Sequence, residues 1–307
     1  MKKLVLLMAL ALSALSLTAC SPATPASEGL NIVATTTQVT EFTQAIVGDT
    51  GTVTGLIQPN QSAHSFDPSA KQLLAISQAD AIVMNGANLE PWLADALAAA
   101  NFDGLIINAT LGIPLIDQDP HVWTSPALAL SMVSNIASNL IDLTGEESGG
   151  PLEWNAVDYE KKLMALDEWT KANFEQVPAE QRLLVTNHDA FTYFVDAYDI
   201  TFIGSIIPSF DDNAEPSAAE LDQLISDIEK SGATAIFSEA SISPKLAKTI
   251  ASEAGVTVYS GEDALYSDSL GVAGSNGETY IKATIHNVTM LMTSWGYPVL
   301  PLPAEIA

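Results

Sequence analysis

Short apolar segments of strand length alternate with segments of helical periodicity along most of this chain of 307 residues. The segments with the composition of buried strands are 31–37, 53–59, 81–84, 104–109, 183–186, 200–207, 235–237 and 256–259. The segments expected to be helical are 40–46, 70–79, 91–100, 127–143, 217–231, 244–255 and 277–295. Strands that alternate with helices in this way predict parallel βαβ units, and therefore an α/β fold.

One longer helix is expected in the middle of the chain, because residues 154–175 contain no glycine or proline and carry apolar residues at helical spacing. At 1.5 Å per residue such a helix spans about 33 Å, which is enough to run the length of a domain. We therefore expect two α/β lobes, each with a central, mostly parallel sheet flanked by helices, joined by one long rigid helix. The expected boundaries are 31–150 for the N-terminal lobe, 151–178 for the connecting helix and 179–307 for the C-terminal lobe.

The N-terminus carries the pattern of an export signal. Lys2 and Lys3 precede an apolar stretch that ends in Leu-Thr-Ala-Cys, and Cys20 is the only cysteine of the chain. This pattern is typical of a secretory signal, and the stretch is shorter than the roughly 20 residues that span a bilayer. The cysteine fits a bacterial lipobox, in which a diacylglycerol is attached to the sulfur before cleavage. A plain secretory signal that happens to end in cysteine is the alternative.

From the lipobox we expect three consequences. Residues 1–19 form a lipoprotein signal peptide, Cys20 is the lipidated residue, and residues 20–30, rich in Ser, Pro and Ala, form a flexible tether. The body of the protein would then be extracytoplasmic and lipid-anchored to the cell membrane. With Cys20 lipidated, the chain has no thiol left for a disulfide, a thiolate metal site or a nucleophile.

The charge balance is strongly acidic. The chain has 37 acidic and 11 basic residues, which gives a formal net charge of −26, and Arg182 is the only arginine. Nucleic-acid binding needs a basic surface, so no nucleic-acid partner is expected. The acidic surface either provides solubility or adaptation to salt, or raises the local concentration of cations near a cleft.

Three of the four histidines lie where loops follow strands or precede helices: His64, His121 and His188. They are far apart in the sequence and form no local metal motif such as HExxH. Spacing alone therefore leaves open whether they share a metal ion. The fourth, His286, lies within an expected helix and is interpreted as a packing or surface residue.

The residues around these histidines carry a wider resemblance. From residue 31 to residue 295 the chain resembles the metal-receptor lipoproteins of bacterial ABC importers for zinc and manganese, the cluster A-I solute-binding proteins. The motifs include Ile32-Val33-Ala34-Thr35-Thr36, Leu89-Glu90-Pro91-Trp92-Leu93, Asp119-Pro120-His121-Val122-Trp123, His188-Asp189-Ala190-Phe191, Phe237-Ser238-Glu239 and Asp268-Ser269-Leu270-Gly271. The resemblance implies two lobes joined by one long helix, and a monomeric, non-enzymatic receptor that delivers its ion to a membrane permease.

The resemblance also implies a set of four metal ligands: His64 and His121 from the first lobe, and His188 and Asp268 from the second. Three imidazole nitrogens and a carboxylate oxygen suit tetrahedral Zn²⁺. Relatives that have glutamate at the position of His188 are associated with manganese, so a third imidazole favours Zn²⁺ and leaves Mn²⁺ as the alternative. The unligated ring nitrogens need partners, for which Asp67, Asn187, Asp189 and Glu239 are candidates.

The sequence departs from the family pattern in two places, and two other functions remain as alternatives to a metal receptor. Ser62-Ala63 stand where the family usually has Asp-Pro, and the chain has no histidine-rich insert before His121. The acidic segment 211–215 lacks the ligand spacing of a calcium loop and is expected to be a solvated loop. A zinc hydrolase would need an open coordination position, which Asp268 would fill. A surface adhesin would bind its partner without the histidines.

Overall fold

The computed structural model describes residues 29–307, so the expected signal peptide, Cys20 and most of the tether lie outside the described residues. The first lobe is built on one parallel sheet with the strand order β2-β1-β3-β4. Its strands are β1 (Leu30–Ala34), β2 (Gly51–Gly55), β3 (Ala81–Met84) and β4 (Leu105–Asn108). Its helices are α1 (Thr37–Val47), α2 (Ala70–Ser77), α3 (Leu93–Ala100) and α4 (Pro126–Thr144).

Helices cover both faces of this sheet, which explains the near-continuous apolar sequence of its strands. Along β1, Ile32 belongs to the cluster shared with α1 and α4, while Val33 points to the opposite face and belongs to the cluster shared with α2 and α3. Within the described residues α4 is the one helix long and apolar enough to cross a membrane, but its buried residues Met132 and Ile136 pack in this core.

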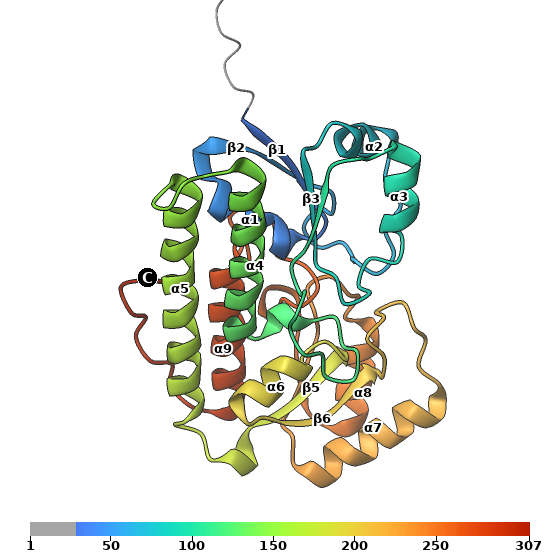
Figure 1. The fold of residues 1–307 in the computed structure, drawn as a ribbon. Helices are drawn as coiled ribbons and strands as arrows, with labels where there is room; N and C mark the ends of the chain where they lie inside the picture. Colours follow the sequence, from blue (N-terminus) through green and yellow to red (C-terminus); the bar gives the residue numbers. More distant parts are fainter. Residues whose placement is uncertain (1–28) are drawn as a thin grey trace, which may run out of the picture.

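The helix α5 (Pro151–Phe174) is the long central helix that the sequence predicts. It starts at a proline in the first helical turn, where the missing N–H would have no helical partner. It packs against α1 and α4 of the first lobe and against α9 (Tyr280–Trp295) of the second. In Figure 1 it runs along one side of both lobes.

The second lobe contains two parallel strand pairs rather than one continuous sheet. They are β5 (Leu183–His188) with β6 (Thr201–Ile207), and β7 (Ala235–Phe237) with β8 (Thr257–Tyr259). The pairs lie side by side, because β5 contacts β7. The flanking helices are α6 (Thr192–Tyr198), α7 (Ala218–Ser231), α8 (Lys245–Ala254) and α9. Four 3₁₀ turns complete the fold: η1 (Gly48–Thr50), η2 (Val122–Thr124), η3 (Ala179–Gln181) and η4 (Gly261–Asp263).

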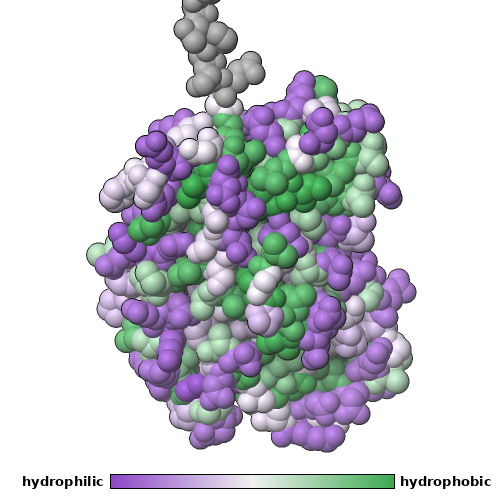
Figure 2. All heavy atoms as spheres, in the orientation of Figure 1, coloured by the Kyte–Doolittle hydropathy of each residue, from purple (hydrophilic) through white to green (hydrophobic). Residues whose placement is uncertain are grey.

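The predicted α/β class is confirmed, and the differences are local. The short helix α6 was not expected. The last helix begins at Tyr280 instead of residue 277, because the Thr279 hydroxyl accepts a hydrogen bond from the backbone N–H of Lys282 and caps the helix there. Figure 2 shows hydrophilic and hydrophobic residues mixed over this face, with hydrophobic areas beside α3 in the first lobe and over part of the second lobe.

Candidate metal centre

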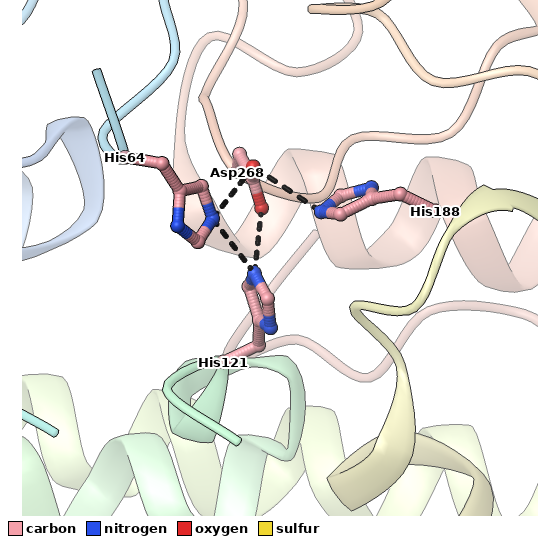
Figure 3. Close-up of side chains that lie close together, drawn as sticks. All are labelled: His64, His121, His188 and Asp268. Carbon is pink, nitrogen blue, oxygen red and sulfur yellow. Dashed lines mark hydrogen bonds and ion pairs between the residues drawn. The ribbon is translucent and has the colours of Figure 1, made fainter. Parts of the chain in front are cut away.

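Four side chains that are distant in the sequence meet between the two lobes. One donor atom from each of His64, His121, His188 and Asp268 lies within 4.8 Å of the others. Figure 3 shows the three imidazoles and the carboxylate pointing toward a common centre. The structure therefore brings together all four residues that the sequence resemblance selects.

The distances between donor atoms suit a small ion. His121 Nε2 lies 3.1 Å from Asp268 Oδ1, and His64 Nε2 lies 3.3 Å from His121 Nε2. Asp268 Oδ2 lies 3.3 Å from His188 Nε2 and 3.4 Å from His64 Nε2. Donors at the corners of a tetrahedron with bonds of about 2.0–2.1 Å are about 3.3 Å apart. These four contacts are close to the spacing of a tetrahedral Zn²⁺ site, and the remaining donor pairs lie within 4.8 Å.

The parallel sheets of the two lobes explain where these residues lie. His64 follows β2, His188 is the last residue of β5, and Asp268 follows β8. Carboxyl ends of parallel strands are the usual ligand-binding edge of an open α/β sheet. The sequence placed His188 in the loop after its strand, whereas β5 continues through it and makes its backbone part of the ladder with Ile207.

Two carboxylates hold the outer nitrogens of two histidines. His121 Nδ1 donates to Asp119 Oδ1 at 2.6 Å, and the same oxygen accepts the backbone N–H of His121 at 2.8 Å. Glu239 Oε2 lies 2.6 Å from His188 Nδ1, and Glu239 Oε1 accepts the backbone N–H of His188 at 2.8 Å. A carboxylate can only accept, so in the neutral imidazole the proton resides on Nδ1 and the lone pair of Nε2 faces the centre.

Of the four sequence candidates for this supporting role, Glu239 contacts a ligand histidine. Asp67, Asn187 and Asp189 make no hydrogen bond to an imidazole within residues 29–307. Asp119 was missed, although it lies two residues before His121 in the Asp-Pro-His motif. That spacing lets one carboxylate oxygen bridge the backbone and ring N–H groups of the same histidine, and it is the signal by which Asp119 could have been found.

Buried polar atoms at the centre lack partners. In the described part of the chain, both carboxylate oxygens of Asp268 and both ring nitrogens of His188 make no hydrogen bond, although both residues are at most 1 % exposed; Nδ1 of His188 has the ion-pair contact with Glu239, whereas the other three atoms face the centre. Buried polar groups are normally satisfied, so unpaired atoms aimed at one point indicate a ligand. The donor chemistry and the unpaired atoms together fit a divalent metal ion.

The electrostatics of the centre place protons where the cation would bind. Burial alone would lower the pKa of His121, but Asp268 and Asp119 outweigh it and raise this pKa to about 9. Burial also opposes the charge on His188, and Glu239 and Asp268 nevertheless hold its pKa well above the usual value. Burial would raise the pKa of Asp268, but His188 and His121 hold it well below its usual range. A metal ion must therefore displace protons from this centre.

The remaining histidine lies outside the cluster. His286 is buried in α9, and its Nε2 contacts the backbone oxygen of Ala264 at 2.9 Å. Of the two expected roles, packing or surface, its burial agrees with packing. The acidic segment 211–215 is only partly the solvated loop that the sequence predicts, because Asp212 is half-buried and bonds to Ser62 of the first lobe at 2.9 Å.

Comparison with known proteins decides the family. Residues 32–294 match the model of the family described as zinc-uptake complex component A, periplasmic. The chain belongs to this family. Its members include relatives named for different metals. The zinc-binding lipoprotein AdcA of Streptococcus pneumoniae serotype 4 is 35% identical over 83% of this chain. The manganese ABC transporter substrate-binding lipoprotein PsaA of Streptococcus anginosus is 27% identical over 94% of this chain and 97% of its own length.

The matched part of AdcA is only 54% of that protein, so the chain spans about half the length of this relative. Solved structures agree with the family along nearly their whole length. The periplasmic zinc-binding protein TroA of Treponema pallidum has a TM-score of 0.80 at 25% identity, covering 87% of this chain and 99% of TroA. A periplasmic metal-binding protein of Candidatus Liberibacter asiaticus has a TM-score of 0.78 at 26% identity, covering 86% and 99% of the two chains.

Proposed function

We propose that this protein is an extracytoplasmic receptor that captures a divalent transition-metal ion, with Zn²⁺ as the preferred cargo, and delivers it to an ABC importer. The observation that carries the proposal is the meeting of three imidazole nitrogens and one carboxylate, with unpaired buried atoms, between the two lobes. Membership of a family of zinc-uptake components supports the same function.

The ion would be held by His64 and His121 from the first lobe and by His188 and Asp268 from the second. Four of the contacts between their donor atoms are 3.1–3.4 Å long, close to the separation in a four-coordinate zinc site, and the whole donor set lies within 4.8 Å. The bound ion would join the lobes, and it would replace the protons that the raised imidazole pKa values retain near neutral pH. Asp119 and Glu239 would hold the imidazoles in the ligating tautomer.

Zinc is preferred over manganese because of the donor set. Three imidazoles and one carboxylate suit Zn²⁺, while Mn²⁺ favours more oxygen donors, and the Irving–Williams order adds to the difference. The relatives are divided, since AdcA is named for zinc while PsaA is named for manganese. The choice therefore rests on the histidine at position 188.

The site is suited to transport rather than to hydrolysis. With Asp268 as the fourth donor, a tetrahedral ion has no position left for the water molecule that a catalytic zinc activates. A receptor needs capture and release only. We propose further that the protein acts as a monomer, anchored to the membrane through a lipid on Cys20, and that its partner is the permease of the importer.

The test measures metal binding directly. Purified protein is stripped with a chelator, then titrated with Zn²⁺ and Mn²⁺ in competition, and its metal content is measured by mass spectrometry. We expect one ion per chain, tighter binding of zinc, and loss of binding in His121→Ala and Asp268→Ala. His286→Gln is the matched control, because it removes a buried histidine outside the cluster. Unchanged binding in both ligand variants would refute the proposed site.

A further inference from the structure

A loop of the second lobe crosses to the segment that carries His64. This loop joins β6 to α7, and its Asp212 accepts a hydrogen bond from the Ser62 hydroxyl of the first lobe at 2.9 Å. The Ser62 oxygen in turn accepts the backbone N–H of His64 at 3.2 Å. A chain of two hydrogen bonds therefore links a second-lobe carboxylate to the backbone of a first-lobe ligand.

The crossing loop is also tied to the other side of the centre. The backbone N–H of Asp189, next to His188, donates to the backbone carbonyl oxygen of Ser209 at 3.2 Å. The Phe210 ring lies beside the His121 ring, with 6.4 Å between centroids. Asn213 Nδ2 donates to Asp212 Oδ1 at 2.7 Å and orients the carboxylate within the loop. The loop thus spans the ligand cluster from His188 to the segment of His64.

His64 is the ligand that most needs this connection. Its side chain is 9% exposed, whereas the side chains of the other three ligands are fully buried. The Asp268 segment is already bound to the first lobe, because the Ser267 carbonyl accepts hydrogen bonds from Gln38 Nε2 at 2.9 Å and Trp123 Nε1 at 3.0 Å. Release of an ion therefore requires least rearrangement at His64.

Charge couples the crossing loop to the occupancy of the centre. The Asp212 carboxylate is half-buried, and burial and the charge of Asp268 both raise the pKa of Asp212. A divalent cation at the centre adds two positive charges and reverses the sign of that interaction. The hydrogen bond between Asp212 and Ser62 is then stabilised when the ion is bound and weakened when it has left.

We propose that Asp212 and Ser62 form a latch that holds His64 on the bound ion, so that opening of this latch sets the rate of metal release. The inference rests on the proposed function and adds a structural element that controls the rate of metal release. Asp212 is a positioning residue, because it acts on the ion through Ser62 and the backbone of His64.

The experiment measures release of Zn²⁺ from loaded protein into excess fluorescent chelator by stopped flow. Ser62→Ala removes the donor, Asp212→Ala removes the acceptor, and Asp212→Asn keeps an acceptor oxygen while it removes the charge. We expect Ser62→Ala and Asp212→Ala to release zinc about five- to tenfold faster, the range for one half-exposed hydrogen bond to a carboxylate. Asp212→Asn should fall between them and the unmodified protein.

The matched control is Asp211→Asn. It makes the same charge change one residue away, and in the described structure its carboxylate accepts hydrogen bonds from the backbone and side chain of Asn213, within its own loop. Because the Asn213 side chain bonds to both carboxylates, this variant also reports any indirect effect through Asn213, and its release rate should change much less than that of Asp212→Asn. The double variant of Ser62→Ala and Asp212→Ala should release no faster than either single variant, because both remove one interaction.

Two outcomes distinguish failure of the latch from failure of the proposed metal-receptor function. Unmodified protein that binds no zinc at equilibrium refutes the proposed function and the latch with it. If the unmodified protein binds zinc but the latch variants release it at the unmodified rate, the latch alone is refuted. The same holds if Asp211→Asn releases zinc as fast as Asp212→Asn. Melting curves of the metal-free variants identify any that fail to fold, and Asp212→Asn, which conserves shape, keeps the comparison decisive.

Discussion

Replacement of Glu239 by glutamine should switch the tautomer of His188 and so disable a metal donor. In the native chain the two carboxylate oxygens face two donors: the backbone N–H of His188 at 2.8 Å and His188 Nδ1 at 2.6 Å. Glutamine offers one oxygen and one NH₂ group. A backbone N–H cannot move its proton, so the amide oxygen must face it, and the NH₂ group then faces Nδ1.

The consequence follows from the chemistry of imidazole. Opposite an NH₂ donor, Nδ1 must become the acceptor, which moves the ring proton to Nε2, the atom that faces the ion. Loss of a supporting partner usually costs 10- to 100-fold in metal affinity, and a proton on the donor atom places this variant at the upper end. We expect about 100-fold, equivalent to about 2.8 kcal/mol at 1.4 kcal/mol per factor of ten. Ser267, which also donates to Glu239, can turn its hydroxyl and accept instead.

Asp119→Asn is the matched comparison at the neighbouring histidine. Asp119 Oδ1 alone accepts both the backbone N–H and Nδ1–H of His121, and in the described structure Oδ2 has no hydrogen-bond partner. Asparagine can keep its oxygen at the first position and place its NH₂ group at the second. The tautomer of His121 is then retained, and affinity should fall by about tenfold or less.

The assay combines competition titration against a zinc chelator with long-range proton–nitrogen NMR of the imidazoles, which identifies the protonated ring nitrogen. The reasoning fails if His188 in Glu239→Gln still carries its proton on Nδ1, or if its zinc affinity stays within threefold of the native value. It fails equally if Asp119→Asn and Glu239→Gln lose affinity by the same factor.

Three further expectations follow from the site and its surroundings. Because the pKa of His121 is raised from 6.5 to about 9, zinc affinity should rise with pH up to about 9, and calorimetry should detect proton release on binding. The stability that protonated His121 gives the metal-free protein is complete below pH 6.5 and is lost as pH rises towards 9. A flat zinc affinity from pH 7 to 9 would contradict this expectation. His188→Glu should narrow the preference for zinc over manganese in a competition titration, since it replaces an imidazole by an oxygen donor, and an unchanged ratio would argue against the role of this histidine. Burial raises the pKa of Glu41, which accepts hydrogen bonds from the Tyr280 N–H and the Tyr159 hydroxyl, from 4.5 to about 7. Stability therefore falls as pH rises from 4.5 to about 7 and stays lower above that pH, so Glu41→Gln should raise the free energy of unfolding by about 3 kcal/mol at pH 8 and by little at pH 4.5, as measured by urea denaturation.

The sequence by itself determined the class of fold. Buried parallel strands such as 81–84 and 235–237 are continuous apolar runs between amphipathic helices, and this pattern is local. The long helix was equally visible, because residues 152–174 lack glycine and proline. Where prediction and structure differ, a contact decided the boundary: β5 extends through His188 because its backbone pairs with β6, and α9 starts later because Thr279 caps it.

The four ligand residues were also selected from the sequence, but through resemblance of short motifs rather than from spacing. Only the tertiary structure decided that their donor atoms lie within 4.8 Å of one another, that Asp119 and Glu239 contact the outer ring nitrogens, and that Asp212 reaches Ser62 across the lobes. Local sequence records the propensity of each segment, whereas distances, burial and pKa values depend on segments far apart in the chain. Long-range packing brings these segments together, and no single segment carries that information.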